Sequence, residues 1–232
     1  MTEFIARLAV FTVLPVLLGA AIVVFDRTAI GPVRRAEAFL IPLFLVGVGG
    51  SGLSGFIAHV FISDPVARSI GWESGSPFQL EVGIANLAIG LLGAVAAERR
   101  DGFREATVVA ATVFGVGATV VHLMDIAATG NLPSGISPHN VSSLATPALL
   151  IWFLLALRRA ERTEQPTIVL RSWMIPVRRG SVAAVGIAAT AFAVGYSTGQ
   201  MVVLSVAGIA AAAVAFWWII SRAASHRARA EA

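Results

Sequence analysis

Seven long apolar runs constrain the fold of this chain more than any other feature. They cover roughly residues 4–25, 38–62, 78–97, 105–128, 141–157, 180–196 and 201–221. A helix needs about 20 apolar residues to cross a bilayer, with about 17 as the lower limit, so the fifth and sixth runs are short. The pattern predicts an all-α, polytopic transmembrane helix bundle of about seven spans that forms a single domain over residues 1–232.

Composition agrees with a membrane location. Hydrophobic residues make up 57% of the chain and charged residues 13%, whereas an average soluble domain is about 25% charged. We therefore expect a multi-pass protein of the cell membrane, with the lipid bilayer as its first partner. The net charge of +4 comes from arginines at the ends of spans, where they meet lipid headgroups, so we expect no nucleic-acid partner.

Two residue types are missing, and their absence excludes several kinds of chemistry. The chain has no cysteine, which removes disulfides and cysteine-ligated cofactors. It also has no lysine, so all 17 basic residues are arginine. A retinal Schiff base needs a lysine, and the chain is therefore no retinal-linked rhodopsin despite its seven predicted spans. Lysine-free usage rich in alanine and arginine is typical of a GC-rich bacterium.

The arginines predict an orientation. Fifteen of them fall on one side of the predicted bundle, and two, Arg7 and Arg68, fall on the other. Cytoplasmic loops are enriched in basic residues. The asymmetry therefore predicts an N-terminus outside the cell and a C-terminus in the cytoplasm.

Polar residues gather toward the predicted outer surface. Ionisable groups inside a membrane are costly and often mark a functional site. The histidines, acids and amides singled out in this chain lie in the outer halves of the second, third and fourth spans or in the loop after the fourth. The candidate residues are His59, Gln79, Glu81, Asn86, His122, Asp125 and Asn131. The sequence therefore predicts a polar site that opens to the outside.

Small residues predict how these spans meet. Glycines and other small or polar residues recur every three or four positions on the second span (Gly47, Ser51, Gly55, His59), on the third (Gln79, Gly83, Asn86, Gly90, Gly93) and on the fourth (Gly115, Ala118, His122). Small residues let membrane helices approach closely. We expect the three spans to pack through these faces, with the polar residues where the faces open outward.

The residue types suggest two kinds of ligand. His59, Glu81, His122 and Asp125 offer nitrogen and oxygen ligands for a divalent metal. Gln79, Glu81, Asn86 and Asn131 could bind a small molecule.

Local roles stay open for most of these residues. Ser76 and Gln79 fit a capping box at the start of a helix. Glu81 could hydrogen-bond a neighbouring helix, and His122 with Asp125 could face lipid headgroups. Trp72 is typical of an interfacial anchor.

One stretch resembles a known family. The residues Gly71-Trp72, Ser76-Pro77-Phe78-Gln79, Glu81-x-Gly83 and Ala85-Asn86, with a later His122-x-x-Asp125 and Asn131, resemble a family of small uncharacterised integral membrane proteins of bacteria and archaea. The resemblance covers roughly residues 55–140. It implies a multi-pass membrane protein and carries no mechanism.

Three functions fit the sequence. The first is an outward-facing site in the membrane that binds a metal or a small ligand. The second is a proton-coupled transporter of small solutes, since ionisable residues in spans often mark transport paths. The third is a structural or accessory subunit that docks to a membrane complex or to further copies of itself. Enzymatic activity is left open.

Overall fold

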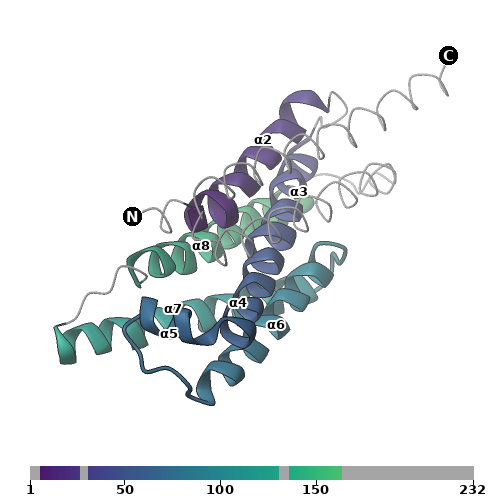
Figure 1. Cartoon of the computed structure of the whole chain (residues 1–232). Coiled ribbons are helices and arrows are strands. Elements are labelled where there is room, and N and C mark those ends of the chain that lie inside the picture. The colour runs from purple at the N-terminus through teal and green to yellow at the C-terminus, as the bar shows by residue number, and fades with distance from the viewer. Residues whose placement is uncertain (1–5, 27–30, 131–135, 164–232) are drawn as a thin grey trace.

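The structure, a computed structural model, describes residues 6–26, 31–130 and 136–163. All regular elements over these residues are helical, which confirms the predicted class for this part of the chain. They are η1 (Ala9–Val13), α2 (Leu14–Phe25), α3 (Pro32–Pro42), η2 (Leu43–Gly50), α4 (Ser51–Phe61), α5 (Ser63–Ser69), α6 (Phe78–Ala96), α7 (Phe103–Thr129) and α8 (Ile136–Glu161), where η denotes a π-helix (Figure 1).

Five helical stretches of the described chain are long and apolar enough to cross a membrane. They are Ala6–Phe25, Pro32–Phe61, Phe78–Ala96, Phe103–Thr129 and Val141–Glu161. The second begins six residues before its predicted start at 38, and the fifth runs past its predicted end at 157, so it is not short. The predicted spans 180–196 and 201–221 lie outside the described residues. The total of seven spans, the single domain and the orientation of the termini stay predictions.

The second span is the centre of the described bundle. Its most apolar window is 72% buried, against at most 44% in the other four spans. The continuous helix α3–η2–α4 contacts α2 and α8 along its first half and α6 along its second half (Figure 1). Helices α6, α7 and α8 follow one another around it. One helix therefore links both ends of the bundle.

Two prolines lie next to changes in helix type. Pro42 ends α3, and the π-helix η2 follows it at once. Pro15 is the second residue of α2, which follows the π-helix η1 directly. Proline lacks an N–H and its ring crowds the carbonyl four residues earlier, which disrupts the α-helical hydrogen bonds. A π-helical turn is one way to accommodate that disruption within a helix.

Helices η2–α4 and α6 pack through glycine. A methyl group placed on Gly52 would lie 2.5 Å from the carbonyl oxygen of Asn86 and 2.6 Å from the Cα of Gly90. One on Gly93 would lie 2.7 Å from the carbonyl oxygen of Phe44. The two backbones are too close for any side chain there, as small residues allow in membrane helices. The predicted packing of the second and third spans is confirmed.

The fourth span departs from that prediction. A methyl group on Gly115 of α7 would lie 2.6 Å from the carbonyl oxygen of Ser143 on α8. Gly115 therefore packs against the fifth span. The prediction that it packs on the second and third spans is wrong. The face of α7 that carries Ala118 and His122 is left to line a cavity.

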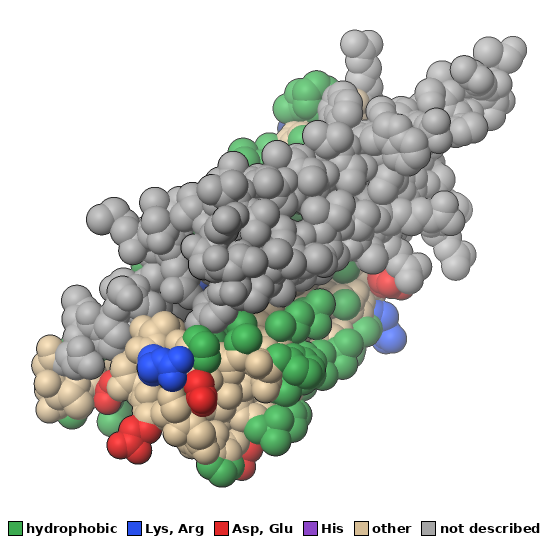
Figure 2. All heavy atoms as spheres, in the orientation of Figure 1, with side chains coloured by type: hydrophobic (Ala, Val, Ile, Leu, Met, Phe, Trp, Pro, Cys, Tyr) green, Lys and Arg blue, Asp and Glu red, His purple; other side chains and the backbone are tan. Residues whose placement is uncertain are grey.

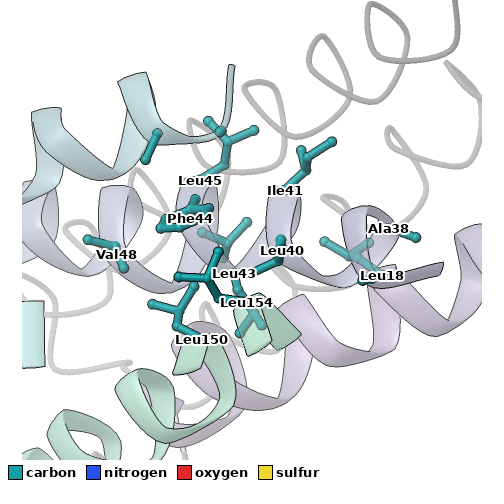
Figure 3. Close-up of a cluster of buried hydrophobic side chains, with 14 of the residues drawn as sticks. Leu18, Ala38, Leu40, Ile41, Leu43, Phe44, Leu45, Val48, Leu150 and Leu154 are labelled. Carbon is teal, nitrogen blue, oxygen red and sulfur yellow. The ribbon is translucent and has the colours of Figure 1, made fainter. Parts of the chain in front are cut away.

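A hydrophobic cluster fills the middle of the bundle. Leu40, Leu43 and Phe44 are completely buried at the junction of α3 and η2. Leu18 of α2 and Leu150 and Leu154 of α8 pack around them (Figure 3). Because these side chains are close-packed, they separate the two ends of the described bundle.

A buried ion pair closes one end. Glu37 of α3 and Arg104 of α7 both have fully buried side chains. The Arg104 guanidinium donates to the two carboxylate oxygens of Glu37 at 2.6 and 3.1 Å. Its Nε also donates to the carbonyl oxygen of Ala96, the last residue of α6, at 3.0 Å. We call this the ion-pair end of the bundle.

The outer surfaces of the helices suit lipid. On α6 the exposed apolar residues Leu80, Ile84, Leu91 and Val95 recur at helical spacing, which forms one stripe along the helix. Figure 2 shows a band of hydrophobic side chains over this part of the molecule, with charged side chains toward its ends. A face of this kind is typical of a helix that contacts hydrocarbon.

Candidate functional site

A hydrogen bond between two helices marks the opposite end of the bundle. The Nδ1 of His59, near the end of α4, lies 2.5 Å from the Oε1 of Gln79 in the first turn of α6. Gln79 is buried and His59 is half-buried. The close approach of α4 and α6 at their glycines brings these side chains within reach. We call this the histidine end (His59, Gln79 and His122).

Gln79 does not complete the expected capping box. Ser76 performs its part weakly, since its Oγ accepts a hydrogen bond from the N–H of Phe78 at 3.3 Å. The Gln79 side chain contacts His59 across the helix interface, and α6 has no side-chain cap at its N-terminus. The local interpretation of Gln79 is therefore replaced by a contact between spans.

His122 brings α7 into the same end. Its side chain is buried, and its ring lies 5.4 Å from the ring of Trp72, measured between centroids. Trp72 belongs to the loop between α5 and α6, and it also contacts Phe78 at 5.9 Å. The tryptophan expected at the membrane surface is thus half-buried against the candidate site.

A cavity of about 370 Å³ lies among these residues. We call it the large chamber. Its lining is mostly apolar and comes from the start of the first span, α4, α5, the loop after α5, α6 and α7. The residues with polar atoms in their side chains that line it are Arg7, His59, Ser69, Trp72, Asn86 and His122. The structure therefore brings the two predicted histidines to one space.

A second cavity of about 90 Å³ lies deeper in the bundle. We call it the small chamber. Hydroxyl groups from η2–α4 and α8 line it, and Thr12 and Thr146 hydrogen-bond beside it at 3.0 Å. A space of this size with several polar groups in its walls can hold water or a compact polar group. Arg7, Asn86 and Phe114 line both chambers.

The other predicted site residues have mixed positions. Asn86 lines both chambers, with its Nδ2 donating to the carbonyl oxygen of Val82 at 2.8 Å. Glu81 is exposed and lines neither chamber. It follows Gln79 by two residues, which turns it roughly 200° around the helix. Asp125 is half-buried beyond His122 and also lines neither chamber. Asn131 lies outside the described residues.

The arrangement does not support the metal interpretation. Among residues 6–26, 31–130 and 136–163, no three histidine, aspartate or glutamate side chains form a group that could hold a metal ion. The set His59, Glu81, His122 and Asp125 is divided, because Glu81 and Asp125 do not line the space that the histidines share. What the site offers is hydrogen bonding within an apolar cavity.

Arg7 was not among the predicted site residues. Its charge was used only to predict the orientation of the chain, yet Arg7 lines both chambers. A signal was available, since Arg7 is a lone charge at the start of an apolar helix, on the side with almost no other arginine. Intramembrane charges of that kind are functional candidates.

Comparison with known proteins gives a family without an activity. A family model described as "Family of unknown function (DUF6790)" matches residues 6–163. That range includes every residue of both chambers. No curated protein and no solved structure matches the chain.

Proposed function

The chain belongs to the Family of unknown function (DUF6790), and from its own geometry we propose that it is an integral membrane protein that binds a small amphipathic molecule in the large chamber. The large chamber is the observation that carries this proposal. Ligand sites are concave, mainly apolar and about 300–1,000 Å³, with a few polar groups that orient the ligand. A chamber of about 370 Å³ with His59 and His122 in its wall has these properties.

The position of the chamber supports entry from the bilayer. Val113, Val121 and Phe78 line the chamber and are 67%, 50% and 48% exposed. Their apolar side chains leave the chamber open on a face suited to hydrocarbon. With the orientation that the arginines predict, this opening lies in the outer half of the membrane. A molecule that partitions into lipid could reach the site without crossing water.

Binding is better supported than transport. Gly47 and Val48 are the residues of η2 that line the small chamber. Beyond them toward α3, Leu43 and Phe44 are completely buried, and the Glu37–Arg104 pair follows. Nothing in the described lining continues the cavity past this barrier. Docking to a membrane complex, or to further copies of the chain, stays a prediction.

Fluorescence of Trp72 tests the proposal, because this residue lines the large chamber. The protein would keep Trp72 as its sole tryptophan, with phenylalanine at Trp152, Trp173, Trp217 and Trp218. It would be reconstituted in phosphatidylcholine nanodiscs and titrated with 11-bromoundecanol, whose bromine quenches tryptophan on contact. We expect saturable quenching above the background from bulk lipid.

Gly117→Leu supplies the decisive variant. Gly117 lines the large chamber, and a Cβ there meets no atom within 4 Å. A leucine therefore fits there without disturbing the backbone, and we expect its side chain to take up chamber volume and abolish the saturable quenching. Ala106→Leu is the matched control, because Ala106 is exposed on the same helix and lines neither chamber. Equal quenching in both variants would refute the proposal.

A further inference from the structure

The two chambers share part of their walls. Arg7, Asn86 and Phe114 line both of them, so these residues mark the junction. Both chambers have mainly apolar walls, but four hydroxyl side chains line the small chamber (Ser51, Ser142, Ser143 and Thr146), whereas that of Ser69 alone lines the large one. A ligand that extends across the junction would therefore meet more hydroxyl groups at one end than at the other.

The permanent charge that the described lining brings to the junction is positive. Among the described residues that line either chamber, Arg7 is the one permanently charged side chain, and none is aspartate or glutamate. The described acidic residues near this end, Asp64, Glu73, Glu81 and Asp125, lie outside the lining. The remaining ionisable groups in the walls are His59 and His122, which are neutral or positive. The lining therefore favours an anion over a cation.

Two of the hydroxyl groups that line the small chamber already donate hydrogen bonds within the protein. Ser51 donates to the carbonyl oxygen of Gly47 at 2.6 Å, and Thr146 donates to that of Phe11 at 3.2 Å. An incoming anion needs donors, and the guanidinium of Arg7 has five N–H groups. It can bind a carboxylate and still keep a contact to the protein. Charge-assisted bonds of this kind are stronger than neutral ones.

We propose that the ligand is a single-chain amphiphile with a compact anionic head, that Arg7 binds the head at the junction of the chambers, and that the chain fills the large chamber. This inference rests on the proposed function and adds the ligand's class and its direction in the site. It gives the lone arginine of the N-terminal span a part in recognition.

The test compares two probes that differ in the head alone. In the Trp72-only protein at pH 8, 11-bromoundecanoate should quench with an apparent Kd about tenfold lower than that of 11-bromoundecanol, the equivalent of about 1.4 kcal/mol. Arg7→Gln should remove most of this difference, and Arg7→Lys should keep part of it. Comparison within one lipid composition cancels the different partitioning of the two probes.

The outcomes separate this inference from the proposed function. If Gly117→Leu blocks the alcohol but the carboxylate shows no advantage, the chamber binds amphiphiles and the anionic preference is refuted. A preference that persists in Arg7→Gln also refutes the role of Arg7. If neither probe gives saturable quenching that Gly117→Leu removes, the proposed function fails as well. A bromoundecyl trimethylammonium probe that binds as well as the carboxylate would again contradict the inference.

Discussion

The two ends of the central helix are built in opposite ways. Glu37, near the start of the helix, has a fully buried carboxylate that accepts two hydrogen bonds from Arg104. His59, near its other end, makes one interhelical hydrogen bond, to Gln79, beside a chamber of about 370 Å³. Glu37 and His59 are 22 positions apart, which corresponds to roughly 33 Å of ideal helix, close to the thickness of the hydrocarbon core.

This difference suggests a division of labour. Arg104 contacts both the start of the central helix and the end of α6, so it joins three helices at the ion-pair end. With the helices held there and at the glycine contacts, they do not need to close at the histidine end. A cavity can therefore persist at that end without loss of the bundle.

The largest expected effect is at the ion-pair end. Glu37→Gln removes the carboxylate and leaves the buried Arg104 charge uncompensated. Removal of one partner of a buried pair typically costs about 3–5 kcal/mol. We expect a decrease of that size in the free energy of unfolding, measured by SDS titration in mixed micelles. A decrease no larger than that of a substitution at the histidine end would contradict the proposed difference between the ends.

The glycine contact between the two ends should show an intermediate effect. Gly52→Ala places a Cβ against the Asn86 carbonyl, where no flexible side chain can move aside. Overpacking of this kind costs about 1–3 kcal/mol. The shift of α4 should also weaken quenching of Trp72 by 11-bromoundecanol. Gly117→Ala is the control, because its Cβ meets open space, and it should not lower stability.

The hydrogen bond at the histidine end should contribute less. Gln79→Leu keeps much of the side-chain volume and removes the acceptor for His59. A typical net contribution of one hydrogen bond is about 1 kcal/mol, so the free energy of unfolding should fall by about that amount in the same SDS titration. A loss as large as that of Glu37→Gln would show that this end is also essential to the assembly of the bundle.

The smallest effect should come from an exposed ion pair near the buried one. Arg99 hydrogen-bonds to Asp101 and thereby holds the pKa of Asp101 below its ordinary value. Any stabilisation from this pair is fully present above the pKa that Asp101 has in the unfolded chain. It is lost as the pH falls through the lower pKa that Asp101 has in the folded protein. Because exposed pairs contribute little, Asp101→Asn should leave the Tm unchanged at pH 7 in a thermal melt in detergent. A clear drop would mean that exposure does not distinguish this pair from Glu37–Arg104.

The sequence alone was sufficient to predict the described helices and the end of the bundle at which the polar residues gather. Apolar length predicted the described spans, and small-residue spacing predicted the contact of Gly52 with α6. The positions of His59, Gln79 and His122 along the predicted spans also placed them at one end. These features depend on local patterns, which a single sequence records directly.

What could not be predicted depends on contacts between distant segments. Arg104 and Glu37 are 67 positions apart, and their charges look like ordinary residues of the cytoplasmic end until the helices are packed. Gln79 could reach its own backbone or His59, and the choice rests on how closely α4 approaches α6. Glu81 was grouped with the site by residue type, although helix spacing already places it off the stripe that contains Gln79, and in the structure it lines neither chamber.

The π-helix η2 has a consequence for the geometry of the whole chain. A π-helix winds fewer turns per residue than an α-helix, so the eight residues Leu43–Gly50 determine the angle by which α4 is rotated relative to α3. That angle aims His59 at Gln79 while Glu37 still faces Arg104. Insertion or deletion of a single residue in this stretch would rotate α4 about the helix axis relative to α3, and it would turn the side chains of one half away from their present partners.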